Sequence, residues 1–348
     1  MEKEKIQLSG AQEKAARILY GKTELLDDEA RRMQKLILSS KADGTLVQYC
    51  DSIRKWKEYA KKKKFQEFPI RKKDFSAYIT NLDKWGTPFS FLKTLLAAIP
   101  FWYAARNCDE IVVTKEPFVK LLMEGAMRSA AKRKGNVSKV ETIEEGKIKE
   151  ILRKTFWPYS NDSIPNSDKK AWRIGVRLYT YYKSFCRFDC YKRLGPTSFK
   201  FENDHVKINF PKAKNDQMYQ GSMSIIASLP GDKLCPKLVY KTYFDVMGFK
   251  GILEELMNCR FDRRGQVKRS LLLSQSSSSQ ETKEFLKSHG LEGKFSEKSL
   301  KASGVTTVLD KGAPLVDVQI AGRWKGLQTP LFYHNSSIER RAAISKLT

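Results

Sequence analysis

The side chains that could do chemistry are concentrated in three stretches of the C-terminal half. They are Cys186-Arg187-Phe188-Asp189, the lysine-rich turn Lys212-Ala213-Lys214-Asn215-Asp216-Gln217, and Gly322-Arg323-Trp324-Lys325, which Tyr333 follows nine residues after the tryptophan. Guanidinium and ammonium groups bind and neutralise anionic oxygens, and a phenol oxygen can form a covalent intermediate. The combination indicates chemistry on an anionic substrate.

Other reaction classes lack their motifs. The sequence has no Walker loop, no GxGxxG and no HExxH, and three histidines argue against metal or serine-hydrolase chemistry. The six cysteines are scattered, and no two of them form a CxxC pair. We therefore expect neither a zinc site nor a disulfide framework, and no cofactor.

The charge of the chain points to the class of partner. The 348 residues, roughly two domains' worth, carry a formal net charge of +26, while 41% hydrophobic residues suffice for folded cores. Residues 1–40 hold 8 basic and 7 acidic side chains, so nearly all of the excess lies in 41–142 and 143–348. This distribution predicts two basic domains that bind a polyanion.

The sequence predicts no membrane segment. Its longest apolar stretch, Phe91 to Ala105, is too short to span a bilayer and contains Lys93 and Pro100. Met1 to Lys14 alternates acids and bases and does not resemble a signal peptide. We expect an intracellular protein, located in the nucleus if the source is eukaryotic and otherwise in the cytoplasm or nucleoid.

The elements of the first half predict a helical domain over 41–131. Apolar residues recur every three or four positions in Thr45 to Lys64, in the stretch after Pro69, in Phe89 to Arg106 and in Phe118 to Ala131. The following segment, Lys132-Arg133-Lys134-Gly135-Asn136, is basic and lacks this periodicity, so 132–142 is the predicted linker. Residues 1–40 are expected to form an N-terminal helical extension.

The second half, 143–348, has a mixed pattern that must position the reactive residues. Helices are expected over Glu144 to Phe156, Lys170 to Phe185 and Pro236 to Met247, and around Phe285. Alternating residues predict a hairpin of Ser198 to Phe201 with Val206 to Phe210, and a third strand over Met223 to Ala227. The tract Ser274 to Gln280 is expected to be an exposed loop. The fold class is mainly α with a small antiparallel sheet, α+β.

Taken in order, these stretches resemble the tyrosine recombinases, the phage-integrase-like enzymes, and in particular those of eukaryotic mobile elements. The signature of that family is an Arg, a Lys in a β-turn, HxxR, a His or Trp, and the nucleophilic Tyr. The resemblance implies the first arginine at Arg187, the turn lysine at Lys214 with Lys212 as second candidate, Trp324 at the His/Trp position, and Tyr333 as nucleophile. It covers all but the first forty residues.

The resemblance also implies an architecture and an activity. The helical domain would be the core-binding domain of a C-shaped clamp, and the protein would act as a homotetramer on two sites of double-stranded DNA. It would cleave and rejoin DNA through a 3′-phosphotyrosine, with Arg187 neutralising the phosphate, Lys214 protonating the leaving oxygen, and no metal. The basic residues expected to contact DNA phosphates are Lys61, Lys62, Lys63, Lys64, Arg71, Lys72, Lys73, Lys132, Arg133, Lys134 and Lys212.

Three positions depart from the family pattern. At the HxxR position the sequence reads Lys298-Ser299-Leu300-Lys301, and Cys190 stands where the first box has a glutamate. Lys301 would supply charge without the bidentate fork of an arginine, and Lys298 would accept the tyrosine proton only if it is neutral. Two hypotheses therefore stay open: an active recombinase, and a recombinase-derived protein that binds DNA without cleaving it.

Overall fold

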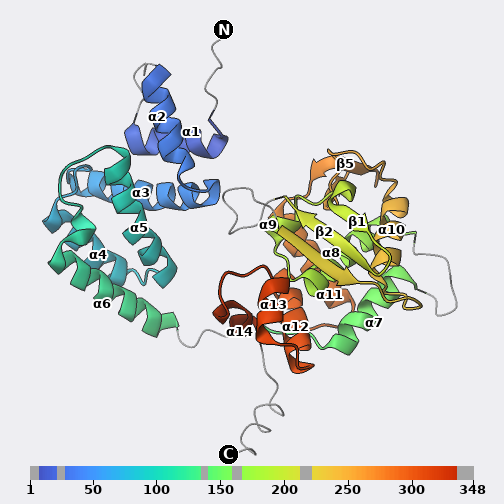
Figure 1. The fold of residues 1–348 in the computed structure, drawn as a ribbon. Coiled ribbons are helices and arrows are strands. Elements are labelled where there is room, and N and C mark those ends of the chain that lie inside the picture. The colour runs from blue at the N-terminus through green and yellow to red at the C-terminus, as the bar shows by residue number, and fades with distance from the viewer. Residues whose placement is uncertain (1–7, 22–27, 135–139, 159–166, 212–221, 335–348) are drawn as a thin grey trace, which may run out of the picture. The chain divides into compact units, whose positions relative to one another are not determined.

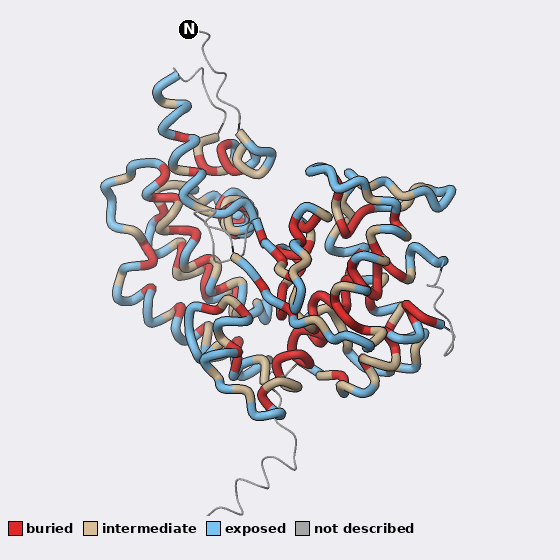
Figure 2. The backbone as a smooth tube through the Cα atoms, turned by 45° about the vertical axis from the view of Figure 1, so that its right-hand side comes forward, coloured by how far each residue is buried: buried red, intermediate tan, exposed pale blue. Residues whose placement is uncertain are grey.

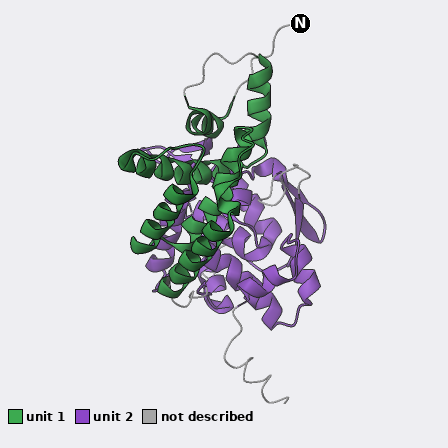
Figure 3. Ribbon diagram, turned by 90° about the vertical axis from the view of Figure 1, so that its left-hand side faces the viewer, with its two compact units in different colours: residues 1–137 green, residues 138–348 purple. Residues whose placement is uncertain are grey.

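The computed structural model describes residues 8–21, 28–134, 140–158, 167–211 and 222–334, apart from the side chain of residue 134. The chain forms two compact units, Met1–Val137 and Ser138–Thr348 (Figure 3). Along the helices of both units, buried positions recur between exposed ones, as expected for amphipathic helices around a core (Figure 2). No helix within the described residues is long and apolar enough to cross a membrane.

The described part of unit 1 is helical (Figure 1). Its elements are α1 (Gly10–Tyr20), α2 (Asp28–Ser39), α3 (Asp43–Lys63), α4 (Lys72–Lys84), α5 (Phe89–Ala105), the 3₁₀ helix η1 (Val113–Lys115) and α6 (Pro117–Lys134). The four predicted helices are α3 to α6. Trp56 on α3 anchors the core by edge contacts with Phe75 and Tyr78 on α4, at centroid distances of 5.5 and 5.4 Å.

The two ends of unit 1 differ from the sequence prediction. Ala15, Ala16 and Leu19 on α1 are buried in the same core as α3 to α6, and the indole of Trp102 donates to the Leu19 carbonyl at 3.0 Å. Helix α1 therefore belongs to the same core as α3 to α6, whereas the sequence prediction placed it in an extension before the helical domain. Residues 132–134, predicted as linker, continue α6, because a basic segment can extend a helix on its solvent-facing end.

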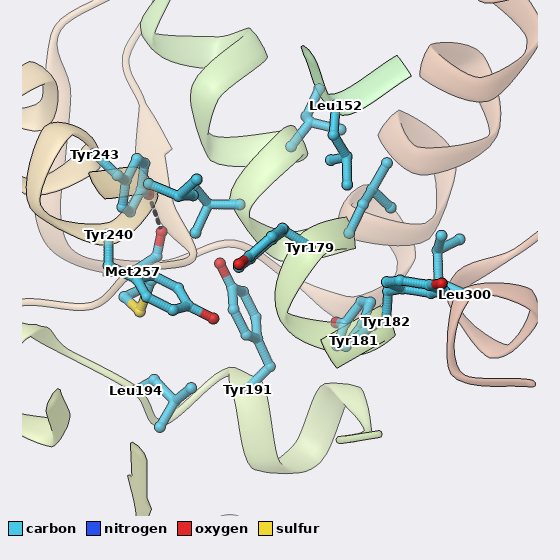
Figure 4. Packing of buried hydrophobic residues seen from close by; sticks show 14 of the residues in the cluster. Leu152, Tyr179, Tyr181, Tyr182, Tyr191, Leu194, Tyr240, Tyr243, Met257 and Leu300 are labelled. Atoms are coloured by element: carbon cyan, nitrogen blue, oxygen red, sulfur yellow. Dashed lines mark hydrogen bonds between the residues drawn. The ribbon is translucent and has the colours of Figure 1, made fainter. Parts of the chain in front are cut away.

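Unit 2 is built around α8 (Lys169–Ser184), which is buried along almost its whole length. The helices around it are α7 (Glu145–Phe156), α9 (Phe188–Tyr191), α10 (Pro236–Met247), α11 (Gln275–Ser288), α12 (Glu297–Asp310), α13 (Leu315–Ala321) and α14 (Gln328–Tyr333), with the 3₁₀ helix η2 (Pro196–Ser198). Tyrosines dominate the centre, where Tyr179, Tyr191 and Tyr240 lie close together (Figure 4). The hydroxyl of Tyr243 donates to the Met257 carbonyl at 2.6 Å, which satisfies a buried polar group.

Two small antiparallel sheets accompany these helices. The first has the order β1 (Phe199–Phe201), β2 (His205–Phe210), β3 (Ser222–Ala227), with Phe199 opposite Ile208 and Val206 opposite Ile226, which confirms the predicted hairpin and third strand. The second, β4 (Cys259–Phe261) with β5 (Val267–Leu272), was not predicted, because β4 has only three residues and β5 is largely exposed. The α+β class is confirmed.

The predicted loop from Ser274 to Gln280 is wrong. The tract forms the first turns of α11, where the Ser274 side chain accepts a hydrogen bond from the Ser277 backbone N–H at 3.1 Å and caps the helix. Ser278 is fully buried and donates to Glu297 on α12 at 2.8 Å. A serine-rich tract predicts a loop because the serine side chain competes for backbone hydrogen bonds. Here one serine caps α11 and another is buried between α11 and α12.

Candidate active site

Tyr333 is the last residue of α14 and lies on a stack of aromatic rings. Its ring is 5.9 Å from that of Trp324 at an interplanar angle of 18°, and Trp324 is 6.1 Å from Phe185 at 10°. Trp324 is buried while Tyr333 is half-buried. The helices α12, α13 and α14 that carry this region lie side by side (Figure 1). The stack fixes the ring of the candidate nucleophile against the core of unit 2.

Arg187 reaches the tyrosine from the connection between α8 and α9. Phe185 adopts a left-handed backbone conformation with φ of 51°, which ends α8 and turns the chain. Arg187 then caps α9, and its Nη2 donates to the Tyr333 hydroxyl oxygen at 3.4 Å. Two residues 146 positions apart in the sequence thus meet at the hydroxyl on which the predicted chemistry depends.

Lys301 lies beneath the same aromatic rings. It is only 3% exposed, and its Nζ is 4.6 Å from the centre of the Trp324 ring and 4.8 Å from that of Tyr333. Burial, followed by the positive charges of Arg187 and Arg323, lowers the pKa of Lys301 to about 7. A lysine in this setting exchanges its proton near neutral pH.

Arg323 is a third cation at the site, which the sequence interpretation did not assign to the chemistry. Its Nη2 donates to the Ser184 carbonyl at 3.1 Å, and its guanidinium carbon lies 4.3 Å from the centre of the Phe210 ring. Burial, together with the charge of Arg187, lowers its pKa. Within the described residues, none of the three cations has a carboxylate partner. Such a cluster has the charge to bind an anion, because positive charge that is buried or half-buried without a partner is costly.

The overall similarity to solved structures decides the fold. The chain is similar to the XerH site-specific recombinase bound to palindromic difH substrate in a post-cleavage complex, with a TM-score of 0.63, 14% identity, and 96% of this chain and 94% of that chain covered. For the XerH pre-cleavage complex with difH, the TM-score is 0.50 and the identity 15%, with 96% and 95% covered. The chain has a tyrosine recombinase fold.

Comparisons based on sequence add nothing to this result. No family model matches the chain, and no curated protein matches it. The Tn1549 transposon integrase in complex with circular intermediate DNA is more distant in structure, with a TM-score of 0.47, 10% identity, and 96% of this chain and 98% of that chain covered. At these identities the similarity establishes the recombinase fold alone.

The other predicted catalytic residues differ in where this recombinase fold places them. Lys298 is exposed on α12, and no described residue forms a hydrogen bond, ion pair or ring contact with its side chain. Lys212 and Lys214, the predicted turn lysines, lie outside the described residues. The Trp324 indole N–H is buried and has no acceptor in the described part of the chain. Cys186 and Cys190, on either side of Arg187, are buried.

A buried polar network, which the sequence did not predict, holds the start of α12, the helix that carries Lys301. Arg177 on α8 is fully buried and donates to Asn258 at 3.0 Å and to Thr282 at 3.1 Å. Its Nε lies 3.9 Å from a carboxylate oxygen of Glu297, the first residue of α12, whose pKa is raised by burial. Because Glu297 precedes Lys301 by about one helical turn, the network fixes the end of α12 that carries the lysine.

The basic residues of unit 1 lie on its surface. Lys61, Lys62, Lys63 and Lys64 are exposed at the end of α3, and Arg71, Lys72 and Lys73 are exposed at the start of α4. Lys132 and Arg133 are exposed on α6, where Arg133 pairs with Asp83 at 2.8 Å. Lys72 is 3.7 Å from Glu116. Metal binding has no candidate here: within the described ranges, no three His, Cys, Asp or Glu side chains are grouped to hold an ion.

Proposed function

We propose that this chain binds double-stranded DNA and cleaves and rejoins a strand through a 3′-phosphotyrosine at Tyr333. The observation that carries the proposal is the 3.4 Å contact between Arg187 Nη2 and the Tyr333 hydroxyl. It places a guanidinium at the oxygen that would attack, beside two more cations, Lys301 and Arg323, that pair with no carboxylate in the described part of the chain. An arrangement of this kind matches what phosphoryl transfer without a metal requires, namely fixed positive charge where negative charge develops.

In the proposed step, the Tyr333 oxygen forms a bond to the phosphorus, and the bond from phosphorus to the 5′ oxygen breaks. Arg187 stabilises the phenolate and then the non-bridging oxygens. Neutral Lys301, which is populated near pH 7, is the candidate acceptor of the tyrosine proton. Lys214 is the candidate donor of a proton to the leaving 5′ oxygen. Religation reverses each transfer, so the bond energy is kept in the phosphotyrosine and no cofactor is consumed.

Duplex DNA is the proposed substrate for two reasons. The net charge of +26 supplies an electrostatic attraction to a polyanion, and the basic side chains at the ends of α3 and α4 are exposed and available for phosphates. The XerH recombinase, which shares the fold, was solved on its difH substrate both before and after cleavage. We also propose assembly as a homotetramer on two DNA sites, to be measured as the mass of the DNA complex in solution.

The test is covalent capture on DNA selected by the protein itself. The Tyr333→Phe variant retrieves bound fragments from a random duplex pool, and each fragment is then rebuilt with nicks that prevent religation. Wild-type protein is expected to form an adduct that resists denaturation, whereas Tyr333→Phe forms none. Arg187→Ala is expected to slow adduct formation by about 100-fold or more. If no selected fragment yields an adduct that depends on Tyr333, strand cleavage is refuted.

A second candidate function, DNA binding without cleavage, is favoured by the lysines that replace both the His and the Arg of HxxR. A buried ammonium at Lys301 does not reproduce an arginine fork, and Lys298 is exposed rather than placed at the tyrosine. Reversion distinguishes the two functions. If Lys301→Arg combined with Lys298→His creates cleavage that the natural protein lacks, the natural function is binding alone.

A further inference from the structure

Arg323 has a backbone conformation that an arginine does not favour. Its φ of 55° lies in the left-handed region, where a side chain is strained and glycine is not. Gly322 precedes it, and a Cβ at Gly322 would come within 2.4 Å of the Trp324 ring, so the chain is tightly wound at this point. An arginine in such a place, rather than a glycine, indicates that the side chain itself is needed.

The side chain is held from two directions and still has donors to offer. Nη2 donates to the Ser184 carbonyl at 3.1 Å, Nη1 donates to the Ala321 carbonyl at 3.3 Å, and the guanidinium packs on the Phe210 ring. A guanidinium carries five N–H donors, so about three remain unused. Ser184 precedes Arg187 by three residues, and Phe210 ends β2. The Arg323 side chain is thus fixed between the end of α8, three residues before Arg187, and the end of β2.

Among the described side chains at this site, none besides Arg187 and Arg323 offers a guanidinium with donors to spare. Lys301, at the second-arginine position of the signature, presents a point charge beneath the Trp324 and Tyr333 rings and cannot grip two oxygens in a plane. We propose that Arg323 is the second guanidinium of the phosphate site and binds non-bridging phosphate oxygens opposite Arg187. This rests on the proposed function for the identity of the anion, a DNA phosphate, and adds the residue that completes its binding.

The catalytic test uses a substitution that the backbone accepts. Arg323→Gly relieves the left-handed strain and removes the guanidinium, Arg323→Lys keeps a charge without the fork, and Lys325→Gln removes an exposed charge two residues away as the matched control. On nicked duplexes at saturating protein, we expect adduct formation about 100-fold slower for Arg323→Gly and at least about 10-fold slower for Arg323→Lys. Lys325→Gln should stay within about 3-fold of wild type. Equal rates for Arg323→Gly and wild type overturn the inference and leave the proposed function standing.

A second measurement tests the inference even if the natural protein does not cleave DNA. The thermal unfolding midpoint is followed while inorganic phosphate replaces chloride at constant ionic strength, because an anion that binds the folded state raises it. Wild type and Lys325→Gln are expected to gain equally, and Arg323→Gly to lose at least half of the gain. If wild type gains nothing, or if Arg323→Gly keeps the full gain, Arg323 is not part of an anion site. Absence of an adduct with a normal Arg323 effect refutes cleavage alone.

Discussion

The burial of Lys301 predicts that the stability of the folded protein depends on pH in a way that one substitution removes. The folded-state pKa of about 7 lies below the ordinary value of 10.5. Between these values the unfolded chain holds a proton on Lys301 that the folded chain has released. Because the unfolded state then binds more protons, the free energy of unfolding rises with pH across this window, and it is lowest below pH 7, where the buried ammonium must be charged.

The size of the effect follows from the linkage relation. A full difference of one bound proton changes the free energy of unfolding by about 1.4 kcal/mol per pH unit. Since Lys301 is half-protonated at pH 7 in the folded state, the gain between pH 7 and pH 9 is about 2 kcal/mol rather than the full value. In Lys301→Met, which keeps the length of the side chain without its charge, this contribution is absent.

The assay is urea unfolding of the full chain at pH 7 and pH 9, followed by tryptophan fluorescence. Each transition is fitted separately, because two compact units need not unfold together. The quantity of interest is the pH difference in wild type minus the pH difference in Lys301→Met, in which the titration of all other groups cancels. Lys298→Met, at the exposed lysine one turn earlier on α12, is the matched control and should behave as wild type.

Two results would refute the proposed effect of burial on the Lys301 proton. If Lys301→Met shows the same rise as wild type, Lys301 keeps its charge in the folded state and burial does not control its proton. If Lys298→Met instead removes the rise in the free energy of unfolding, then Lys298 and not Lys301 is the buried lysine. Added phosphate provides an internal check, because an anion beside Lys301 favours its charged form and should flatten the rise in wild type.

Three further predictions concern the packing that supports the site. Arg177→Met removes the cation beside the half-buried Glu297 carboxylate, which keeps only the hydrogen bond from Ser278, and should lower the free energy of unfolding by about 3–5 kcal/mol, measured by urea unfolding. Tyr243→Phe leaves the buried Met257 carbonyl without its donor and should cost about 1–3 kcal/mol in the same assay. In Gly304→Ala, the new Cβ would meet a backbone oxygen of α8 at 2.2 Å, so α12 must shift; we expect a loss of about 1–3 kcal/mol and faster hydrogen exchange in α12. Unchanged stability in Arg177→Met or Gly304→Ala would show that α12 and α8 do not pack as described, and unchanged stability in Tyr243→Phe would show that its hydrogen bond to Met257 contributes nothing.

Local pattern was sufficient for most of the helices and for the first sheet. The helix Pro236–Met247 has the bounds that the sequence predicted, and the hairpin ending at Phe210 follows from strict alternation of side chains. These features depend on the repeat of the backbone itself, 3.6 residues in a helix and two in a strand, which is visible in any short stretch. The serine tract at Ser274 misled the prediction because its partners, on α12, are distant in the sequence.

The sequence by itself determined the class of the fold, the basic character of both halves, and the candidate roles of Arg187 and Tyr333, since ordered residue types and their spacing are written in the chain. Only the tertiary structure decided which cations meet at the tyrosine. Lys298 and Lys301 differ by about 60° around one helix, and packing against Trp324 buries one and leaves the other in solvent. Arg323 joined the site for the same reason, because burial and proximity are properties of distant segments brought together and no local pattern encodes them.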